Sequence, residues 1–278
     1  MDLNWLQSIL YGLASGLAEI LPVSAQAHRS MLLVFFGENS ESPLLQLMIH
    51  LAALAALYAS CNTQILRLLR AQKLAALPKS RRKRPLDNNS MMDIRILRMA
   101  LIPVIGAFIC YLSAQKLGGN LLYVALFLVI NGIIIYLPPY LPGSNKKSGT
   151  MSRADALLMG LGAGLSVLPG ISAVGAATSV GMICGGERKY VLNTTLLINL
   201  AVMVGLIIFD FVAIFTTGIG GVSFGQFLCF ILSAGAAFGG VYLGVKIMRL
   251  LAENVGFNGF AYYCWGAALL AVILYINF

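Results

Sequence analysis

The sequence predicts an all-α integral membrane protein with six transmembrane helices and two opposed re-entrant helical hairpins, arranged as an inverted-topology repeat. Three observations predict this fold: the composition, two apolar stretches that are interrupted in the middle, and the distribution of basic residues. Apolar residues make up 59% of the 278 residues, charged residues make up 10%, and the mean hydropathy is +0.86. A soluble domain carries roughly 25% charged residues. Long segments of this chain are therefore expected to face lipid.

Six apolar segments are long enough to be candidate spans, since crossing a membrane takes about 20 mostly apolar residues. They are residues 44–61, 99–114, 121–137, 192–215, 227–247 and 260–276. The five cysteines are scattered through apolar segments without paired spacing. We interpret them as small apolar residues rather than as a disulfide framework or a metal site.

Two further apolar stretches, residues 5–36 and 154–184, are longer than one span. The first is interrupted by Leu21-Pro22-Val23-Ser24 and the second by Leu168-Pro169-Gly170-Ile171-Ser172. Proline and glycine break a helix, and the freed backbone groups cannot face lipid. We therefore expect two hairpins that are buried in protein or line a wet cavity; the alternative is two ordinary kinked helices in each stretch.

The two interrupted stretches resemble each other in sequence. Residues 12–17 (GLASGL) and Pro22 are echoed by residues 160–165 (GLGAGL) and Pro169. Because three candidate spans follow each stretch, an internal repeat is predicted within a single membrane domain, 1–278, with halves at 1–148 and 149–278.

Basic residues predict the topology independently. The segment between the first two spans contains ten of them, and the positive-inside rule places it in the cytoplasm. If the hairpins do not cross the membrane, the basic clusters at 146–153, 188–189 and 246–249 fall on the same side. Both termini, with Asp2, Glu38 and Glu41, then fall outside. The ten residues are Arg67, Arg70, Lys73, Lys79, Arg81, Arg82, Lys83, Arg84, Arg95 and Arg98.

This topology has two consequences. Three spans per half is an odd number, so the second half is inverted and the tips of the two hairpins can meet near the midplane, where inverted-repeat transporters place their binding sites. The net charge of +9 is then explained by topogenic segments that also attract anionic lipid head groups, and we expect no nucleic-acid partner.

Ionisable residues within the membrane are the main candidates for chemistry, because burying them in lipid is costly. Glu19 precedes the first break, and His28 and Arg29 follow it. His28 is a candidate for chemistry or for a hydrogen bond across the fold, and Arg29 for phosphate binding or for snorkelling to the outer interface. His50 is expected to face the site or a helix contact, whereas Asp210 is expected near the outer end of its span in a solvated or capping role.

Small residues at the breaks form a second group of candidates. They are Ser24, Gly170, Ser172 and Thr178. Exposed backbone N–H groups and half-helix N-termini at such breaks can hold an anion such as phosphate. The alternative is ordinary packing between helices.

At these residues the chain resembles the undecaprenyl pyrophosphate phosphatase family, also called the bacitracin-resistance family. Residues 16–24 with His28 are similar to the first signature of that family, and residues 168–172 are similar to the start of the second. Weaker likeness runs through residues 49–51, 131–132 and 260–263. The resemblance implies six spans, two opposed re-entrant hairpins, and removal of the terminal phosphate from undecaprenyl pyrophosphate at the outer face of the bacterial inner membrane, with help from a divalent metal.

The chain also departs from the family pattern. Ser15 replaces the first acidic or amide residue of the first signature, and Ala25 replaces a second serine that is proposed as nucleophile. Ala173 and Val174 stand where the second signature continues with arginine and serine, and Ala177 stands at the threonine position, one residue before Thr178. Losing a positive clamp on a transferring phosphoryl group can cost on the order of 10²–10³ in rate.

Three functional hypotheses follow. The first is a polyprenyl pyrophosphate phosphatase that uses His28 as nucleophile or general base, Glu19 to hold Mg²⁺ or Ca²⁺, and Arg29 or backbone amides to stabilise charge. The second is a non-hydrolytic translocase of undecaprenyl phosphate or a related anionic lipid. The third is a scaffold without ligand. A homodimer is left open.

Overall fold

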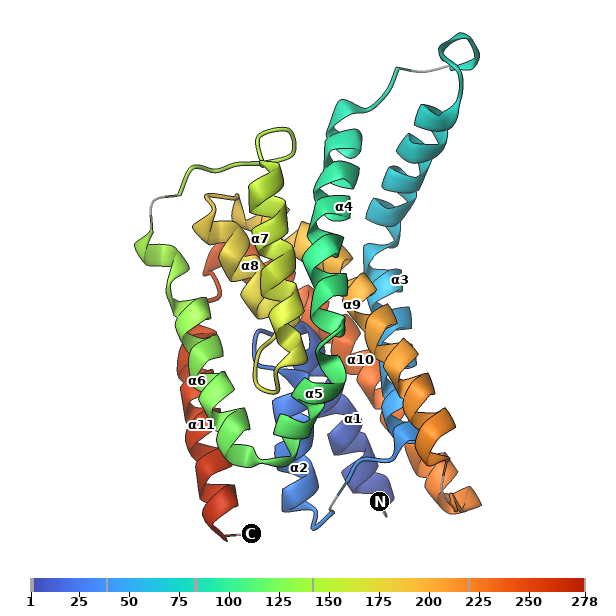
Figure 1. Cartoon of the computed structure of the whole chain (residues 1–278), viewed down its shortest axis with the longest axis vertical. Helices are drawn as coiled ribbons and strands as arrows, with labels where there is room; N and C mark the ends of the chain where they lie inside the picture. Colours follow the sequence, from blue (N-terminus) through green and yellow to red (C-terminus); the bar gives the residue numbers. More distant parts are fainter. Residues whose placement is uncertain (1–2, 39, 83–84, 142, 220, 278) are drawn as a thin grey trace.

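The computed structural model describes residues 3–38, 40–82, 85–141, 143–219 and 221–277, so Asp2, Lys83 and Arg84 lie outside the described residues. The regular elements of this part of the chain are helices (Figure 1). Short 3₁₀ turns occupy Lys79–Arg81, Lys116–Gly119, Pro138–Tyr140 and Leu165–Val167. The α-helices are α1 (Trp5–Ile20), α2 (Ala25–Phe35), α3 (Pro43–Ala76), α4 (Asn88–Phe108), α5 (Tyr111–Gln115), α6 (Leu121–Tyr136), α7 (Arg153–Gly164), α8 (Ala173–Ile183), α9 (Arg188–Thr217), α10 (Phe224–Asn254) and α11 (Gly259–Asn277).

Five helical segments of the described residues are long and apolar enough to cross a membrane. They are α3, α6 with the 3₁₀ turn that follows it, α9, α10 and α11. A sixth crossing results if α4 and the bent segment after it count as one span. The chain is therefore an all-α, multi-pass membrane protein, as its composition predicts.

The second candidate span, residues 99–114, is not one straight helix. Asn88–Phe108 and Tyr111–Gly119 meet at an angle of 59°. At the end of α4 the backbone hydrogen bonds join residues three apart, as in a 3₁₀ turn; one runs from the Cys110 N–H to the Ala107 carbonyl. The rings of Phe108 and Tyr111 pack there against Phe209 of α9, with centroids 4.5 to 5.8 Å apart. The bend turns α5 toward α2.

The segment expected as a long basic loop is mostly helical. α3 continues to Ala76 and α4 begins at Asn88, so both helices project past the rest of the molecule (Figure 1). Leucine, alanine, arginine, lysine and glutamine are strong helix formers. An inward-facing stripe with Leu68 and Ala71 continues the helix packing beyond the apolar segment. The 34 residues of α3 span about 51 Å, well beyond the ~30 Å hydrocarbon core of a membrane.

Both interrupted stretches form pairs of short helices. α1 and α2 have 16 and 11 residues, and α7 and α8 have 12 and 11, so at 1.5 Å per residue each is shorter than a span. The chain turns back near the middle of the molecule in both pairs, and the pairs enter from opposite ends (Figure 1). Each second helix begins at a serine N-cap, Ser24 or Ser172, that accepts a backbone N–H three residues on.

Glycines allow α1 to approach α10 closely. A Cβ atom on Gly12 would lie 2.0 Å from the Ser233 carbonyl oxygen, and one on Gly16 would lie 2.2 Å from the Ala237 carbonyl oxygen. Small residues four apart let two membrane helices touch along their backbones. α1, from the first half of the sequence, is thereby fixed against a helix of the second half.

The same arrangement recurs on α7, which packs against α4. A Cβ atom on Gly160 would lie 2.0 Å from the Ala100 carbonyl oxygen, and one on Gly164 would lie 2.9 Å from the Ala107 methyl. In the repeated sequence pattern, Gly160 matches Gly12 and Gly164 matches Gly16. Each interrupted stretch therefore packs on a helix of the opposite half.

Candidate functional site

The two helix breaks touch each other. The Gly170 N–H donates to Ser24 Oγ at 3.2 Å, and Ser172 Oγ donates to the Leu21 carbonyl at 3.2 Å. The second break thus supplies two donors, and the first break supplies the two acceptors. Backbone groups that a break frees from helix bonding must find such partners, because lipid offers none.

Asn131 of α6 holds both breaks at once. Its Nδ2 donates to the Pro22 carbonyl at 3.1 Å, and its Oδ1 accepts from the Ser172 N–H at 3.0 Å. The side chain is fully buried. Sequence reasoning noted Asn131 only as part of a weak family likeness; the available signal was a lone amide in the middle of an otherwise apolar span.

The backbone is strained on both sides of this junction. Ser24 has φ +65°, a left-handed backbone conformation that residues other than glycine rarely adopt. Backbone strain of this kind is concentrated at functional sites. Gly170 has φ +121°, and a Cβ atom there would lie 2.8 Å from the Leu128 nitrogen on α6. Glycine at 170 is therefore required by conformation and by space, and we assign it a structural role at the junction.

A small enclosed cavity of about 40 Å³ lies beside the junction, and we call it the hairpin cavity. It has room for a few water molecules. α5 covers it because the bend after α4 brings Tyr111 and Gln115 over it, and Gln26 donates to Gln115 at 2.8 Å. Its lining includes Glu19, Ser24, Gln26, Arg29, Tyr111, Gln115, Ser166, Ser172 and Asn199.

Glu19 and Arg29 are the two charged residues that line the hairpin cavity. Arg29 is 6% exposed. Within the described part of the chain, no ion pair or hydrogen bond occupies the Glu19 carboxylate, which leaves it available to a ligand. The structure therefore brings together four residues that the sequence predicted: Glu19, Ser24, Arg29 and Ser172.

Arg29 is held by a buried polar chain. Its Nε lies 3.5 Å from Glu41 Oε2, and one terminal nitrogen lies 3.3 Å from His50 Nε2. Because a guanidinium only donates, His50 Nε2 accepts, so its Nδ1 carries the proton and donates to Asp210 Oδ2 at 2.6 Å. Asp210 thereby fixes the tautomer of His50, and His50 and Glu41 orient Arg29.

One expectation from the sequence was wrong here. Asp210 is 2% exposed rather than solvated or capping, because its face of α9 turns inward onto His50. Of the two alternatives for Arg29, the buried position beside Glu41 does not match snorkelling to an interface. Glu41 is largely buried against Arg29, since a buried guanidinium needs a carboxylate partner. Its place on the outer side of the membrane stays a prediction.

His28 lies outside the lining of the hairpin cavity. Its Nδ1 donates to the Ser24 carbonyl at 2.8 Å, and its Nε2 accepts from the Tyr263 hydroxyl at 2.7 Å. The two rings stack with centroids 5.7 Å apart. These contacts match the alternative in which His28 bonds across the fold. Thr178 is also off the cavity: it is buried, and its hydroxyl has no partner among the described residues.

The hairpin cavity fits a divalent cation only in part. Glu19 is its one carboxylate, and no group of three or more potential metal ligands occurs in the described residues. Mg²⁺ is commonly held by one or two carboxylates together with substrate phosphates. Glu19 could therefore hold Mg²⁺ or Ca²⁺ jointly with a bound phosphate, but not within a cage made by the protein alone.

The fold and this junction define a multi-pass membrane protein with an enclosed, charged site between two helix breaks. The chain belongs to the bacitracin resistance protein BacA family, whose model matches residues 8–270. It is 26% identical to an undecaprenyl-diphosphatase of Methanobrevibacter smithii (98% of this chain, 97% of the relative) and 25% identical to one of Desulforapulum autotrophicum (96% and 97%). It is also 27% identical to undecaprenyl-diphosphatase 1 of Halalkalibacterium halodurans (96% and 94%).

Proposed function

We propose that this chain binds the diphosphate head group of a polyprenyl lipid in the hairpin cavity and hydrolyses its terminal phosphate. The observation that carries the proposal is the buried Arg29 guanidinium beside the unpartnered Glu19 carboxylate, at the junction of the two breaks. Full-length relatives named undecaprenyl-diphosphatase support the substrate class. The lipid partner and a multi-pass location in the bacterial plasma membrane follow from the same proposal.

We further propose that both interrupted stretches are re-entrant and that the halves 1–148 and 149–278 form an inverted repeat. The reciprocal packing of α1 on α10 and of α7 on α4 supports this, as does the pairing of α3 with α9 and of α6 with α11. With six spans, both termini lie on the outer side and the α3–α4 loop in the cytoplasm.

Catalysis would proceed by attack of water on the terminal phosphorus. Glu19 takes the proton of the water, the new P–O bond forms, and the bond to the bridging oxygen breaks, releasing inorganic phosphate and the lipid monophosphate. Arg29 and the positive N-terminal ends of α2 and α8 stabilise the equatorial oxygens. A divalent ion held by Glu19 and the substrate would add further positive charge.

Attack by water, with Arg29 as the cation, requires no side-chain nucleophile and no second arginine in the hairpin cavity. Ala25 and Ala173 line the hairpin cavity at positions where the family resemblance expects a serine and an arginine. Water replaces the serine as nucleophile, and Arg29 supplies the guanidinium from the opposite hairpin. His28 then acts as a positioning residue that ties α2 to Tyr263 of α11.

A diphosphate does not fit a cavity of about 40 Å³, so α5 or the side chains that close the cavity must move to admit the substrate. The prenyl chain has an apolar groove of about 660 Å³ available between α6 and α11. Val129 and Ile133 line this groove, while Asn131, between them on α6, faces the junction.

The test is phosphate release from a polyprenyl diphosphate by purified protein with Mg²⁺. We expect Glu19→Gln to lower kcat about 10²–10⁴-fold, because it removes the general base, and Glu19→Asp to retain part of the activity. Chelation with EDTA should lower the rate of the wild type. Equal rates for wild type and Glu19→Gln would overturn the assignment.

The translocase hypothesis predicts binding without release. The comparisons support the phosphatase and give the translocase no support. Lipid movement between leaflets by a protein that releases no phosphate would reverse this choice.

A further inference from the structure

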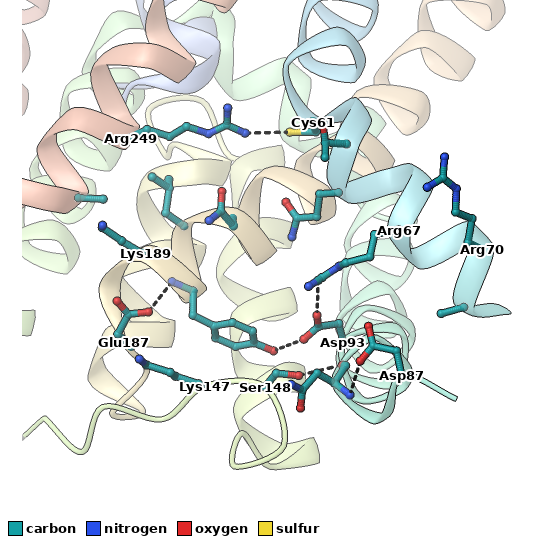
Figure 2. Close-up of a pocket in the computed structure, with 18 of the residues that line it drawn as sticks. Cys61, Arg67, Arg70, Asp87, Asp93, Lys147, Ser148, Glu187, Lys189 and Arg249 are labelled. Carbon is teal, nitrogen blue, oxygen red and sulfur yellow. Dashed lines mark hydrogen bonds and ion pairs between the residues drawn. The ribbon is translucent and has the colours of Figure 1, made fainter. Parts of the chain in front are cut away.

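A second and larger cavity opens at the end of the molecule that carries the α3–α4 loop. Its volume is about 1240 Å³, and its walls come from the second half of α3, the start of α4, residues 147–148, the start of α9 and the end of α10 (Figure 2). We call it the basic vestibule. Ligand pockets commonly measure 300–1000 Å³, so it can hold a sizeable ligand. Five cations and four carboxylates line it.

Two of the four carboxylates are engaged by ion pairs. Asp93 accepts from Arg67 at 2.6 Å and from the Tyr190 hydroxyl at 2.9 Å. Glu253 lies 3.0 Å from Lys189. Each pair neutralises one of the five cations. Figure 2 shows the Arg67–Asp93 pair at the cavity wall.

The other two carboxylates cap helices. Asp87 accepts from the N–H groups at the start of α4, and Glu187 accepts from the Tyr190 N–H at the start of α9 at 3.0 Å. Hydrogen bonds from the Ser90 hydroxyl and N–H hold the pKa of Asp87 below its usual range. Both carboxylates therefore serve positive helix ends rather than the remaining cations.

Three cations remain without a carboxylate partner in the described part of the chain: Arg70, Lys147 and Arg249. Arg249 is half-buried, and one of its nitrogens donates to the Ser60 carbonyl at 3.0 Å, which fixes the guanidinium and leaves other donors free. Figure 2 shows Arg249 extending from α10 toward α3 across the cavity. A guanidinium with free donors favours a bidentate anion such as phosphate.

α9 contributes residues to both cavities. Asn193 lines the basic vestibule and Asn199 lines the hairpin cavity, six residues or about 9 Å along the helix. Between them, Thr195 is fully buried with an unpartnered hydroxyl, and Asn199 has an unpartnered side-chain nitrogen among the described residues. Buried polar groups without partners are costly, so Thr195 and Asn199, four residues apart on one side of α9, are suited to meet a polar ligand or water.

We propose that the basic vestibule is a second binding site, which takes a phosphate-bearing anion through Arg249, Lys147 and Arg70. The anion is the head group of a lipid or a free phosphate, and both have the chemistry that these cations recognise. The proposal does not depend on hydrolysis in the hairpin cavity.

The test is calorimetric titration of the purified full-length chain in detergent with sodium diphosphate and, separately, with farnesyl diphosphate. Arg249→Gln and Lys147→Gln should each weaken the binding of sodium diphosphate and of farnesyl diphosphate about tenfold, because each substitution removes one charge-assisted contact. The matched control is Lys246→Gln, at the same end of α10; Lys246 is exposed over the Tyr242 ring and does not line the cavity. It should bind as the wild type does.

Lys147 lies on an exposed segment, so Lys147→Gln remains informative if Arg249→Gln is unstable. Arg29→Gln should retain a diphosphate site, which separates this proposal from the proposed function. Tighter binding of farnesyl diphosphate than of sodium diphosphate identifies a lipid as the source, and equal binding identifies a free anion. Wild-type affinity in both vestibule variants, or loss of all diphosphate binding in Arg29→Gln alone, would overturn the proposal.

Discussion

Arg29 shows how a single buried charge organises its surroundings. A guanidinium inside a membrane domain requires compensation, which Glu41 and the His50–Asp210 pair supply from α3, the segment before it and α9. Arg29 also lines the hairpin cavity. The residues that orient it are as necessary to the proposed chemistry as Arg29 itself.

The sequence could predict only part of this set. Glu19, Ser24 and Arg29 lie close to one break, so a local pattern of polar residues around a proline indicated them. Asp210 is 160 residues from His50, and counting along a span gives its depth but not the direction it faces. No local pattern joins such a pair.

Asn131 gives a prediction at this scale. Asn131→Ala should lower the free energy of unfolding by about 1–3 kcal/mol, because it leaves the Ser172 N–H buried without a partner and the Pro22 carbonyl with only the Cys264 thiol at 3.4 Å. Denaturant unfolding in detergent measures this. Asn62→Ala, at an exposed position of α3, should change stability by less than about 0.5 kcal/mol. Equal effects in the two variants would show that Asn131 does not hold the junction.

At the scale of elements, proline, glycine and serine predicted both helix breaks, because these residues act on the local backbone. The 59° bend after α4 was not predicted. It depends on an aromatic cluster that includes Phe209 from α9, and so on tertiary packing that a sequence pattern does not contain.

The glycine contacts predict matched effects in the two halves. Gly16→Ala should push α1 away from α10, and Gly160→Ala should push α7 away from α4. Each substitution should therefore destabilise the protein by about 1–3 kcal/mol. Gly239→Ala on α10, where a Cβ atom meets open space, should be neutral or stabilise by up to about 1 kcal/mol. Thermal unfolding of the three variants checks this, and a harmless Gly160→Ala would contradict reciprocal packing.

At the scale of the whole molecule, five of the basic residues that fix the proposed orientation also line the basic vestibule. Topogenic charge alone requires only that these residues lie on one side of the membrane. The partial burial of Arg249 within a walled cavity goes beyond that requirement. One end of the molecule therefore carries both the charge that orients the chain and a candidate anion site.

The orientation can be measured with single cysteines in a chain whose five native cysteines are replaced. A membrane-impermeant maleimide should label Ser40→Cys in intact spheroplasts and label Ser80→Cys, in the α3–α4 loop, only after permeabilisation. Both positions are exposed, so access decides the result. Labelling of both from the same side would rule out the proposed topology.

The most direct test of the central claim is the rate of phosphate release from a polyprenyl diphosphate by wild type, Arg29→Gln and Arg98→Gln. Arg98 is exposed on α4, away from the hairpin cavity, and serves as the matched control. The account predicts release by the wild type and by Arg98→Gln, and a kcat about 10²–10³-fold lower for Arg29→Gln. A wild type that binds the lipid but releases no phosphate, or an Arg29→Gln variant as fast as the wild type, would contradict it.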